Sequence, residues 1–217
     1  YIQEAFDTNW GVPLGPNVNA FEQDLENFVG IHNRKYCDGG QCIRLYKTFM
    51  KKKDPEAANI VMGHNEEDLL GLGTIFSLLA YKKLYDGEYH PKQCVILEQE
   101  LKIVIELSAA APVNVSCGNS DFYLSVNGYE ARMLVHLKEG KLRQYYRNYK
   151  DYEFIPGEDT AMPKSITRYM DKSLKIATTP QTCYTWFNCD EDFLNNEKKQ
   201  MQYLTHTLPF FLDNLNK

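Results

Sequence analysis

Two kinds of hydrophobic periodicity divide the chain near residue 90. Before that point, apolar residues recur at steps of three and four, which is the period of an amphipathic or buried helix. After it, apolar and charged residues alternate, for example over residues 101–107, and this alternation indicates strands. Short strands with close turns favour an antiparallel sheet. The pattern therefore predicts an α+β fold in which helices come first, followed by an antiparallel sheet region and a C-terminal helix.

Three main helices are predicted in the first part. One is capped by Asn19 and ended by Gly30, and a second spans residues 42–50. The third and longest begins with Asp54 as N-cap and a proline at its first position, and continues to about Gly87.

The second part is predicted to be rich in strands. The strand-like segments are residues 94–107, 113–117, 122–126, 132–137, 142–146 and 152–155. Asn127-Gly128 and Glu139-Gly140 are turn signals between them. Residues 190–215 are expected to form a terminal helix that is interrupted or kinked at Pro209.

Composition narrows the classes of protein that fit. The chain has 217 residues, 43% of them hydrophobic and 13% aromatic, which indicates a folded protein of one large or two small domains. The formal charge of −5 excludes a global attraction to nucleic acid, so any such contact would be local. No run of about 18 apolar residues is present, and a membrane span is not expected. The chain begins at Tyr1 rather than Met, which suggests a fragment or a processed product.

The six cysteines are scattered through a chain too large to need disulfides for stability. Their spacing does not match the commonest zinc sites. Free thiols in a reducing cytoplasm are therefore the favoured interpretation, and structural zinc is the alternative.

One pair in the longest predicted helix has possible chemistry. His64 and Asp68 would lie one turn apart, about 6 Å along the axis, on the same face. A histidine and a carboxylate presented together can hold a divalent metal ion and activate water. Spacing alone favours a simpler interpretation, an exposed polar turn whose side chains contact only solvent and each other.

The N-terminal segment resembles one enzyme family. Residues 4–10, 14–18 and 21–22 are similar to the opening of the DegT/DnrJ-family sugar aminotransferases. The resemblance implies pyridoxal phosphate as cofactor, but the family's cofactor-binding residues come much later in the fold, and the likeness stops after Gly30. Residues 1–30 are too few to build a cofactor pocket. We therefore expect a chimeric segment, with its seam between about Phe21 and His32.

From about Phe28 onward a second resemblance begins. Residues 30–32, 39–46 and 64–72 resemble the last third of the YprB-type ribonuclease H-like domain, a relative of the DnaQ-like exonucleases. The resemblance implies that Asp68 helps to hold two divalent ions, Mg or Mn, and that His64 takes the place of a Tyr or His that orients or deprotonates the attacking water. It also implies nucleic acid as the partner.

This second resemblance suggests how the chain is divided. Residues 31–90 would be the C-terminal helices of a ribonuclease H-like domain. Residues 91–217 resemble the β-rich appendage that follows the nuclease domain in clostridial YprB-like proteins, so the likeness spans about residues 28–217.

The family's remaining metal ligands include an Asp-x-Glu on its first strand. In this chain Asn9 stands where that Glu is required. We therefore expect a truncated or chimeric relative of a metal-dependent 3′–5′ exonuclease, incomplete and weakly active or inactive on nucleic acid.

Two alternatives remain. One is a non-catalytic nucleic-acid or protein interaction module, based on interleaved aromatic and basic residues: Arg143, Tyr145, Tyr146, Arg147, Tyr149, Lys150 and Tyr152. A sheet whose tyrosines bury their rings and keep their hydroxyls in water explains the same pattern, and we favour that explanation. The other alternative is a fragment of a DegT/DnrJ-type aminotransferase.

Overall fold

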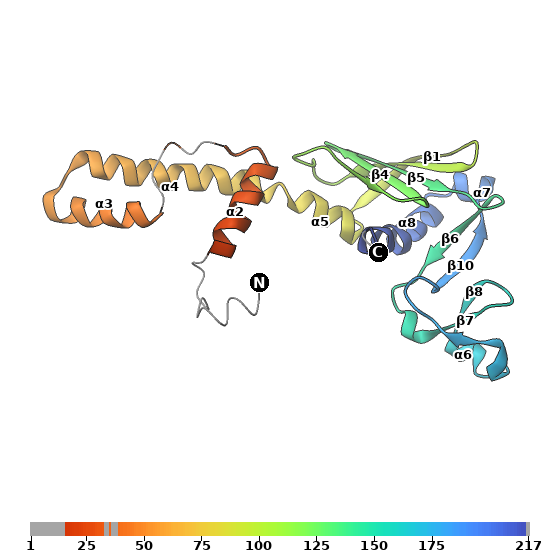
Figure 1. Cartoon of the computed structure of the whole chain (residues 1–217). Helices are drawn as coiled ribbons and strands as arrows, with labels where there is room; N and C mark the ends of the chain where they lie inside the picture. Colours follow the sequence, from red (N-terminus) through yellow and green to blue (C-terminus); the bar gives the residue numbers. More distant parts are fainter. Residues whose placement is uncertain (1–15, 33–34, 36–38, 216–217) are drawn as a thin grey trace. The chain divides into compact units, whose positions relative to one another are not determined.

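A computed structural model shows two compact units, Tyr1–Leu78 and Leu79–Lys217 (Figure 1). It describes residues 16–32, 35 and 39–215, so the first fifteen residues and Cys37 lie outside the described part. Helices come first, then antiparallel sheets and a terminal helix, which confirms the predicted α+β class. The division into segments 1–30, 31–90 and 91–217 remains a prediction.

The first unit contains three helices among its described residues. They are α2 (Pro16–Phe28), α3 (Gly39–Lys52) and α4 (Pro55–Phe76). α3 and α4 lie side by side (Figure 1). The predicted start of α4 is confirmed, because the Asp54 carboxylate accepts a hydrogen bond of 3.0 Å from the Glu56 amide and Pro55 is the first helical residue.

The longest predicted helix is in fact two helices, and the prediction was wrong at this point. α4 ends at Phe76, and α5 runs over Leu79–Asp86. Between them the amides of Ser77 and Leu78 bond to carbonyls three residues back, and the Ser77 hydroxyl also donates to the Thr74 carbonyl. These tighter bonds replace the α-helical pattern and end α4.

A five-stranded antiparallel sheet forms the centre of the second unit, with strand order β1-β2-β5-β4-β3. Its strands are β1 (Tyr89–Leu97), β2 (Glu100–Leu107), β3 (Val115–Gly118), β4 (Phe122–Asn127) and β5 (Glu130–His136). The segment predicted as one strand over residues 94–107 is a hairpin. Glu98 adopts φ = +55° in its turn, and Leu97 pairs with Glu100 across it.

One face of this sheet is buried against the C-terminal helix α8 (Glu197–Asp213). The inward residues of the sheet are Leu101, Ile103, Ile105, Leu107, Phe122, Leu124, Val126, Ala131, Met133 and Val135. From α8, the Phe211 ring stacks on the Phe122 ring with a centroid distance of 4.2 Å. Burial of this apolar area is the main stabilising term of the unit.

Two smaller sheets complete the second unit. β6 (Lys141–Tyr145) pairs with β10 (Tyr184–Asn188), and β7 (Tyr152–Ile155) lies between β8 (Thr160–Pro163) and β9 (Ile176–Ala177). The remaining short elements are α6 (Lys164–Thr167), α7 (Glu191–Leu194) and the 3₁₀ turns at Tyr149–Asp151 and Lys172–Leu174. β6 follows the predicted turn, where Glu139 and Gly140 both have positive φ, as a type I′ turn requires.

The C-terminal helical segment is interrupted at Asn195 and Asn196 rather than at Pro209, so the expected interruption at Pro209 was wrong, while a kink there stays a prediction. The Asn196 side chain accepts a hydrogen bond from the Lys199 amide and caps α8, while Asn195 donates its side-chain amide to the Glu191 carbonyl. Pro209 lies inside α8. Asparagine side chains that bond to the local backbone end one helix and begin the next.

No helix among the described residues is both long enough and apolar enough to span a bilayer.

The Tyr203 hydroxyl yields a stability prediction. Tyr203 is 0% exposed, and its hydroxyl has no hydrogen-bond partner among the described residues. Tyr203→Phe should raise the free energy of unfolding by about 1–3 kcal/mol, because it removes a buried polar group that lost its water. Leu208→Ala, at another buried position of α8, should lower it by about 2–5 kcal/mol. Urea denaturation of both variants measures the two effects. A loss of stability in Tyr203→Phe would mean that the hydroxyl is bonded in solution.

Candidate functional site

Helix α4 brings His64 and Asp68 together. Their four-residue spacing places the His64 Nε2 atom 3.2 Å from the Asp68 Oδ2 atom. The histidine side chain is 14% exposed and the aspartate 45%, so the simple interpretation of an exposed turn does not hold for His64. The Nδ1 atom of His64 is buried without a hydrogen-bond partner among the described residues.

The neighbourhood of this pair does not complete a metal site. Glu67 is adjacent, but its Oε1 atom accepts a hydrogen bond of 2.9 Å from the Lys35 amide. Across the described residues, no three or more His, Cys, Asp or Glu side chains converge on one point. Two-metal hydrolysis needs several carboxylates around ions about 4 Å apart. The described donor set therefore does not fit a two-metal centre.

The aromatic and basic segment of residues 143–152 is largely packed against its own unit. The Tyr145 ring is buried and stacks on Phe210, with centroids 3.7 Å apart. The Tyr146 ring stacks on Tyr152 at 5.2 Å, and the Arg147 guanidinium lies 4.8 Å from the centroid of Tyr85. These ring contacts leave fewer faces on which a base could stack.

The hydroxyl of Tyr146 in this segment is also hydrogen-bonded. Its partners are the Gln144 side-chain amide at 2.9 Å and the Thr185 hydroxyl at 3.0 Å. The buried-ring interpretation is therefore the better one, although side chains, rather than water, satisfy this hydroxyl.

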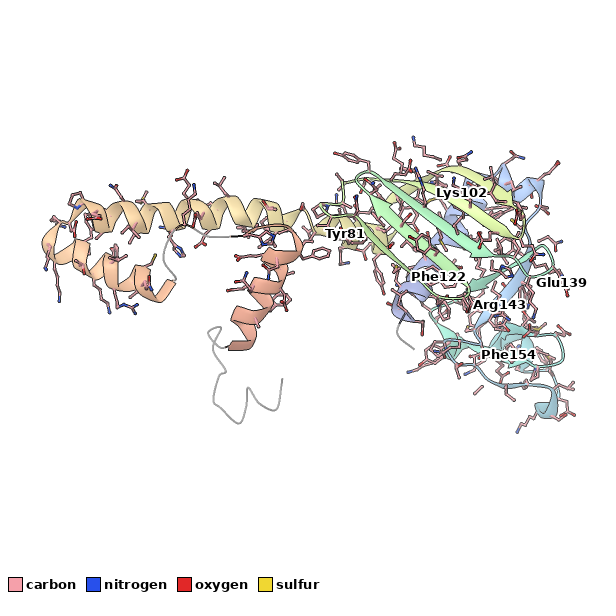
Figure 2. All side chains as sticks on the ribbon, turned by 45° about the horizontal axis from the view of Figure 1, so that its top comes forward. Tyr81, Lys102, Phe122, Glu139, Arg143 and Phe154 are labelled. Carbon is pink, nitrogen blue, oxygen red and sulfur yellow. The ribbon has the colours of Figure 1, made fainter. Side chains whose placement is uncertain are left out.

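A basic cavity lies beside this segment. It has a volume of about 350 Å³ and is lined by Asp121, Val135, His136, Lys138, Lys141, Arg143, Tyr145, Trp186 and Phe211. In Figure 2, Arg143 lies between Phe122, which belongs to β4 of the five-stranded sheet, and Phe154, which belongs to β7 of the three-stranded sheet. We refer to this space as the basic cavity.

Strand pairing positions Arg143 in the cavity wall. In the β6–β10 register Arg143 is directly opposite Trp186, and Tyr184 is the diagonal neighbour on the same face. The guanidinium carbon lies 4.5 Å from the ring centroid of Tyr184 and 4.6 Å from that of Trp186. The Lys138 ammonium lies 5.6 Å from the Trp186 centroid. The two aromatic rings thus hold two cations in place.

Asp159 binds the same two aromatic residues through hydrogen bonds. It accepts hydrogen bonds from the Tyr184 hydroxyl at 2.5 Å and from the Trp186 indole nitrogen at 3.2 Å. Burial and the hydrogen bond with Asp159 raise the pKa of Tyr184 to about 12, so Tyr184 remains a neutral donor at physiological pH.

The cavity was not predicted from the sequence. Arg143 was grouped with its neighbours along the chain, whereas its partners come from β10, about forty residues later. The only local signal was a turn flanked by lysines, Lys138-Glu139-Gly140-Lys141.

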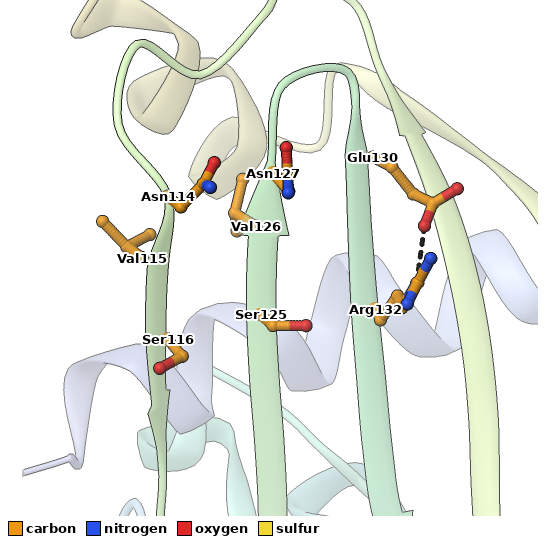
Figure 3. Close-up of a pocket in the computed structure, with 8 residues that line it drawn as sticks. All are labelled: Asn114, Val115, Ser116, Ser125, Val126, Asn127, Glu130 and Arg132. Carbon is orange, nitrogen blue, oxygen red and sulfur yellow. Dashed lines mark hydrogen bonds and ion pairs between the residues drawn. The ribbon is translucent and has the colours of Figure 1, made fainter.

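A second hollow, of about 470 Å³, lies over the polar ends of β3, β4 and β5 (Figure 3). Its polar lining consists of Asn114, Ser116, Ser125, Asn127, Glu130 and Arg132. The two charges neutralise each other, since the Nε atom of Arg132 lies 2.6 Å from the Oε1 atom of Glu130. This hollow offers amides and hydroxyls but no unpaired charge.

The five described cysteines are free thiols. Burial raises the pKa of Cys94 to about 12 and that of Cys183 and Cys189 to about 11. These three thiols are therefore protonated at neutral pH and poor nucleophiles or ligands.

Comparison with known proteins supports part of the second resemblance. The model of the RNase_H superfamily matches residues 21–80, which include α3, α4 and the His64–Asp68 pair. A ribonuclease H-like segment is thus supported over these residues.

The chain is also similar to EpsN of Bacillus subtilis (strain 168), which bears the name of a pyridoxal phosphate-dependent aminotransferase. The two are 58% identical over 31 residues, which are 14% of this chain. The chain spans only 8% of the length of that relative. No solved structure matches the chain.

His206 of α8 yields a pH prediction. Its ring lies 5.3 Å from that of Tyr146, and burial together with the charge of Arg147 lowers the pKa of His206 from its usual 6.5. Below pH 6.5 the unfolded state therefore binds more protons than the folded state, and the free energy of unfolding should fall as the pH decreases. His206→Gln should flatten this dependence between about pH 7 and pH 5.

Urea midpoints at several pH values measure the effect, with His136→Gln as a control for the loss of another imidazole. An unchanged slope in His206→Gln would contradict the assignment.

Proposed function

We propose that the chain is a relative of the YprB-type ribonuclease H-like exonucleases, and that the His64–Asp68 pair of α4 corresponds to the water-orienting residue and one metal ligand of that family. The superfamily match over residues 21–80 is the observation that carries the proposal. The contact of 3.2 Å between the two side chains supports it. Mg or Mn would be the ion, and nucleic acid the substrate.

The described residues supply only part of such a centre. Asp68 would be one ligand, and further carboxylates would have to come from outside the described residues or from another chain. This shortage supports weak activity, or none, in the chain as it stands.

The orientation of the His64 ring toward Asp68 supports the same conclusion. A carboxylate is an acceptor only, so the Nε2 atom that faces Asp68 must carry the proton. The lone pair of a neutral imidazole is then on Nδ1, which is buried. A general base must reach the water that it deprotonates. In this arrangement His64 would need to turn its ring, or to open the site, before it could act.

The two alternatives have less support. The interaction module was based on residues 143–152, where Tyr145 and Tyr146 already stack on Phe210 and Tyr152. The aminotransferase alternative rests on a likeness of 31 residues, 8% of that relative. So short a segment cannot surround a cofactor.

Nuclease assays with a 3′-labelled single-stranded oligonucleotide test the proposal. Any trimming should be weak, require Mn²⁺ or Mg²⁺, and fall by at least about a hundredfold in Asp68→Asn and His64→Ala. Asp86→Asn is the matched control, because Asp86 also forms an i,i+4 pair with a basic residue, Lys82, but lies on α5. Trimming that does not depend on metal, or that persists in Asp68→Asn, would contradict the assigned roles.

A further inference from the structure

We propose that the basic cavity binds a phosphorylated small molecule, with its phosphate group held by Lys138, Lys141 and Arg143. Side chains from β5, β6, β10 and α8 line this cavity, together with the turn before β6. It belongs entirely to the second unit and does not involve His64 or Asp68.

The charge of the cavity is the first reason. Lys138, Lys141 and Arg143 line it, and none of them forms an ion pair with a carboxylate of the described residues. Asp121 is the one carboxylate in the lining. Asp159, close to Arg143, accepts hydrogen bonds from Tyr184 and Trp186 and keeps its negative charge. Three cations against these two carboxylates still leave an excess of positive charge that an oxyanion would neutralise.

The unsatisfied nitrogen of Arg143 is the second reason. Its Nε atom is buried and has no hydrogen-bond partner among the described residues. A buried N–H group without an acceptor is costly, and native structures seldom leave one. Cation–π contacts with both Tyr184 and Trp186 hold the guanidinium in advance, so little side-chain entropy would be lost when a ligand binds. Phosphate oxygens are the acceptors that suit a guanidinium best.

The shape of the site separates a small molecule from a nucleic-acid strand. A volume of about 350 Å³ falls within the usual range for small-molecule pockets. A strand needs a basic groove with free aromatic faces. Here the Trp186 ring already contacts the cations of Arg143 and Lys138, and the Tyr146 ring stacks on Tyr152.

The neighbouring hollow sets the direction of binding. It has a volume of about 440 Å³, shares Lys138, Lys141 and Trp186 with the basic cavity, and adds Glu139, Glu158 and Asp159. Glu139 and Glu158 would repel a phosphate. The anion would therefore lie on the Arg143 side, and the organic part of the ligand toward Val135 and Phe211.

Titration calorimetry of the full chain with pyrophosphate and with adenosine monophosphate tests the proposal. Both should bind, and added salt should weaken them, because the contacts are ionic. Lys138→Ala and Lys141→Ala should each weaken binding by about tenfold. Lys102→Ala is the matched control, since Lys102 lies on β2 away from the cavity, and it should leave binding unchanged (Figure 2).

Asp121→Asn provides a test in the opposite direction. It keeps the shape of the side chain but removes the only negative charge of the lining, so binding should become several-fold tighter. Thermal unfolding of each variant verifies that it is folded. The proposal is overturned if neither ligand binds the wild-type chain, or if Lys102→Ala weakens binding as much as Lys141→Ala. It is also overturned if a single-stranded oligonucleotide without a terminal phosphate binds more tightly than both ligands and depends on the same lysines.

Discussion

Contact between α8 and the five-stranded sheet is the constraint on which the second unit depends. The helix buries Tyr203, Leu204 and Leu208 completely and stacks Phe211 on Phe122 of β4. It also holds the smaller β6–β10 sheet, because Phe210 stacks on Tyr145. One helix thus fixes two sheets. The register of β6 against β10 follows from this anchoring, and with it the pairing that places Arg143 opposite Trp186.

The described residues of the first unit form no comparable core. Ala57 and Gly63 are the buried residues of α4, whereas Leu69 and Leu70 are 72% and 69% exposed. Apolar residues lie all round this helix, a pattern typical of helices buried on several sides. The resemblance to a ribonuclease H-like domain implies a mixed sheet flanked by helices. Among the described residues of this unit, however, only helices are found. The Asp54 cap and the helix propensity of α4 are local properties, and they do not depend on packing against a sheet.

This difference also explains what the sequence could predict. Helix caps, the Glu139-Gly140 turn and strand alternation act over a few residues, so the α+β class and the start of α4 were predictable. The break at Ser77 and the turn at Glu98 were missed, because a serine within a helical pattern and a glutamate at positive φ carry no strong signal. The spacing of His64 and Asp68 predicted their contact, since it lies within one helix. The basic cavity was not predictable, because its cations and rings meet only through the pairing of distant strands.

The His64–Asp68 pair and the basic cavity differ most clearly in how their charged groups are partnered. The Nε2 atom of His64 and the Oδ2 atom of Asp68 are already in contact, so a ligand that recruits either atom must first break that contact. Lys138, Lys141 and Arg143 form no ion pair with a carboxylate of the described residues, and the Nε atom of Arg143 is buried without an acceptor among them. An unmet hydrogen bond of this kind costs about 1–3 kcal/mol, and an anionic ligand would recover that energy on binding. The preorganised cations are therefore the part of this chain best suited to bind a ligand, although no sequence motif marks them.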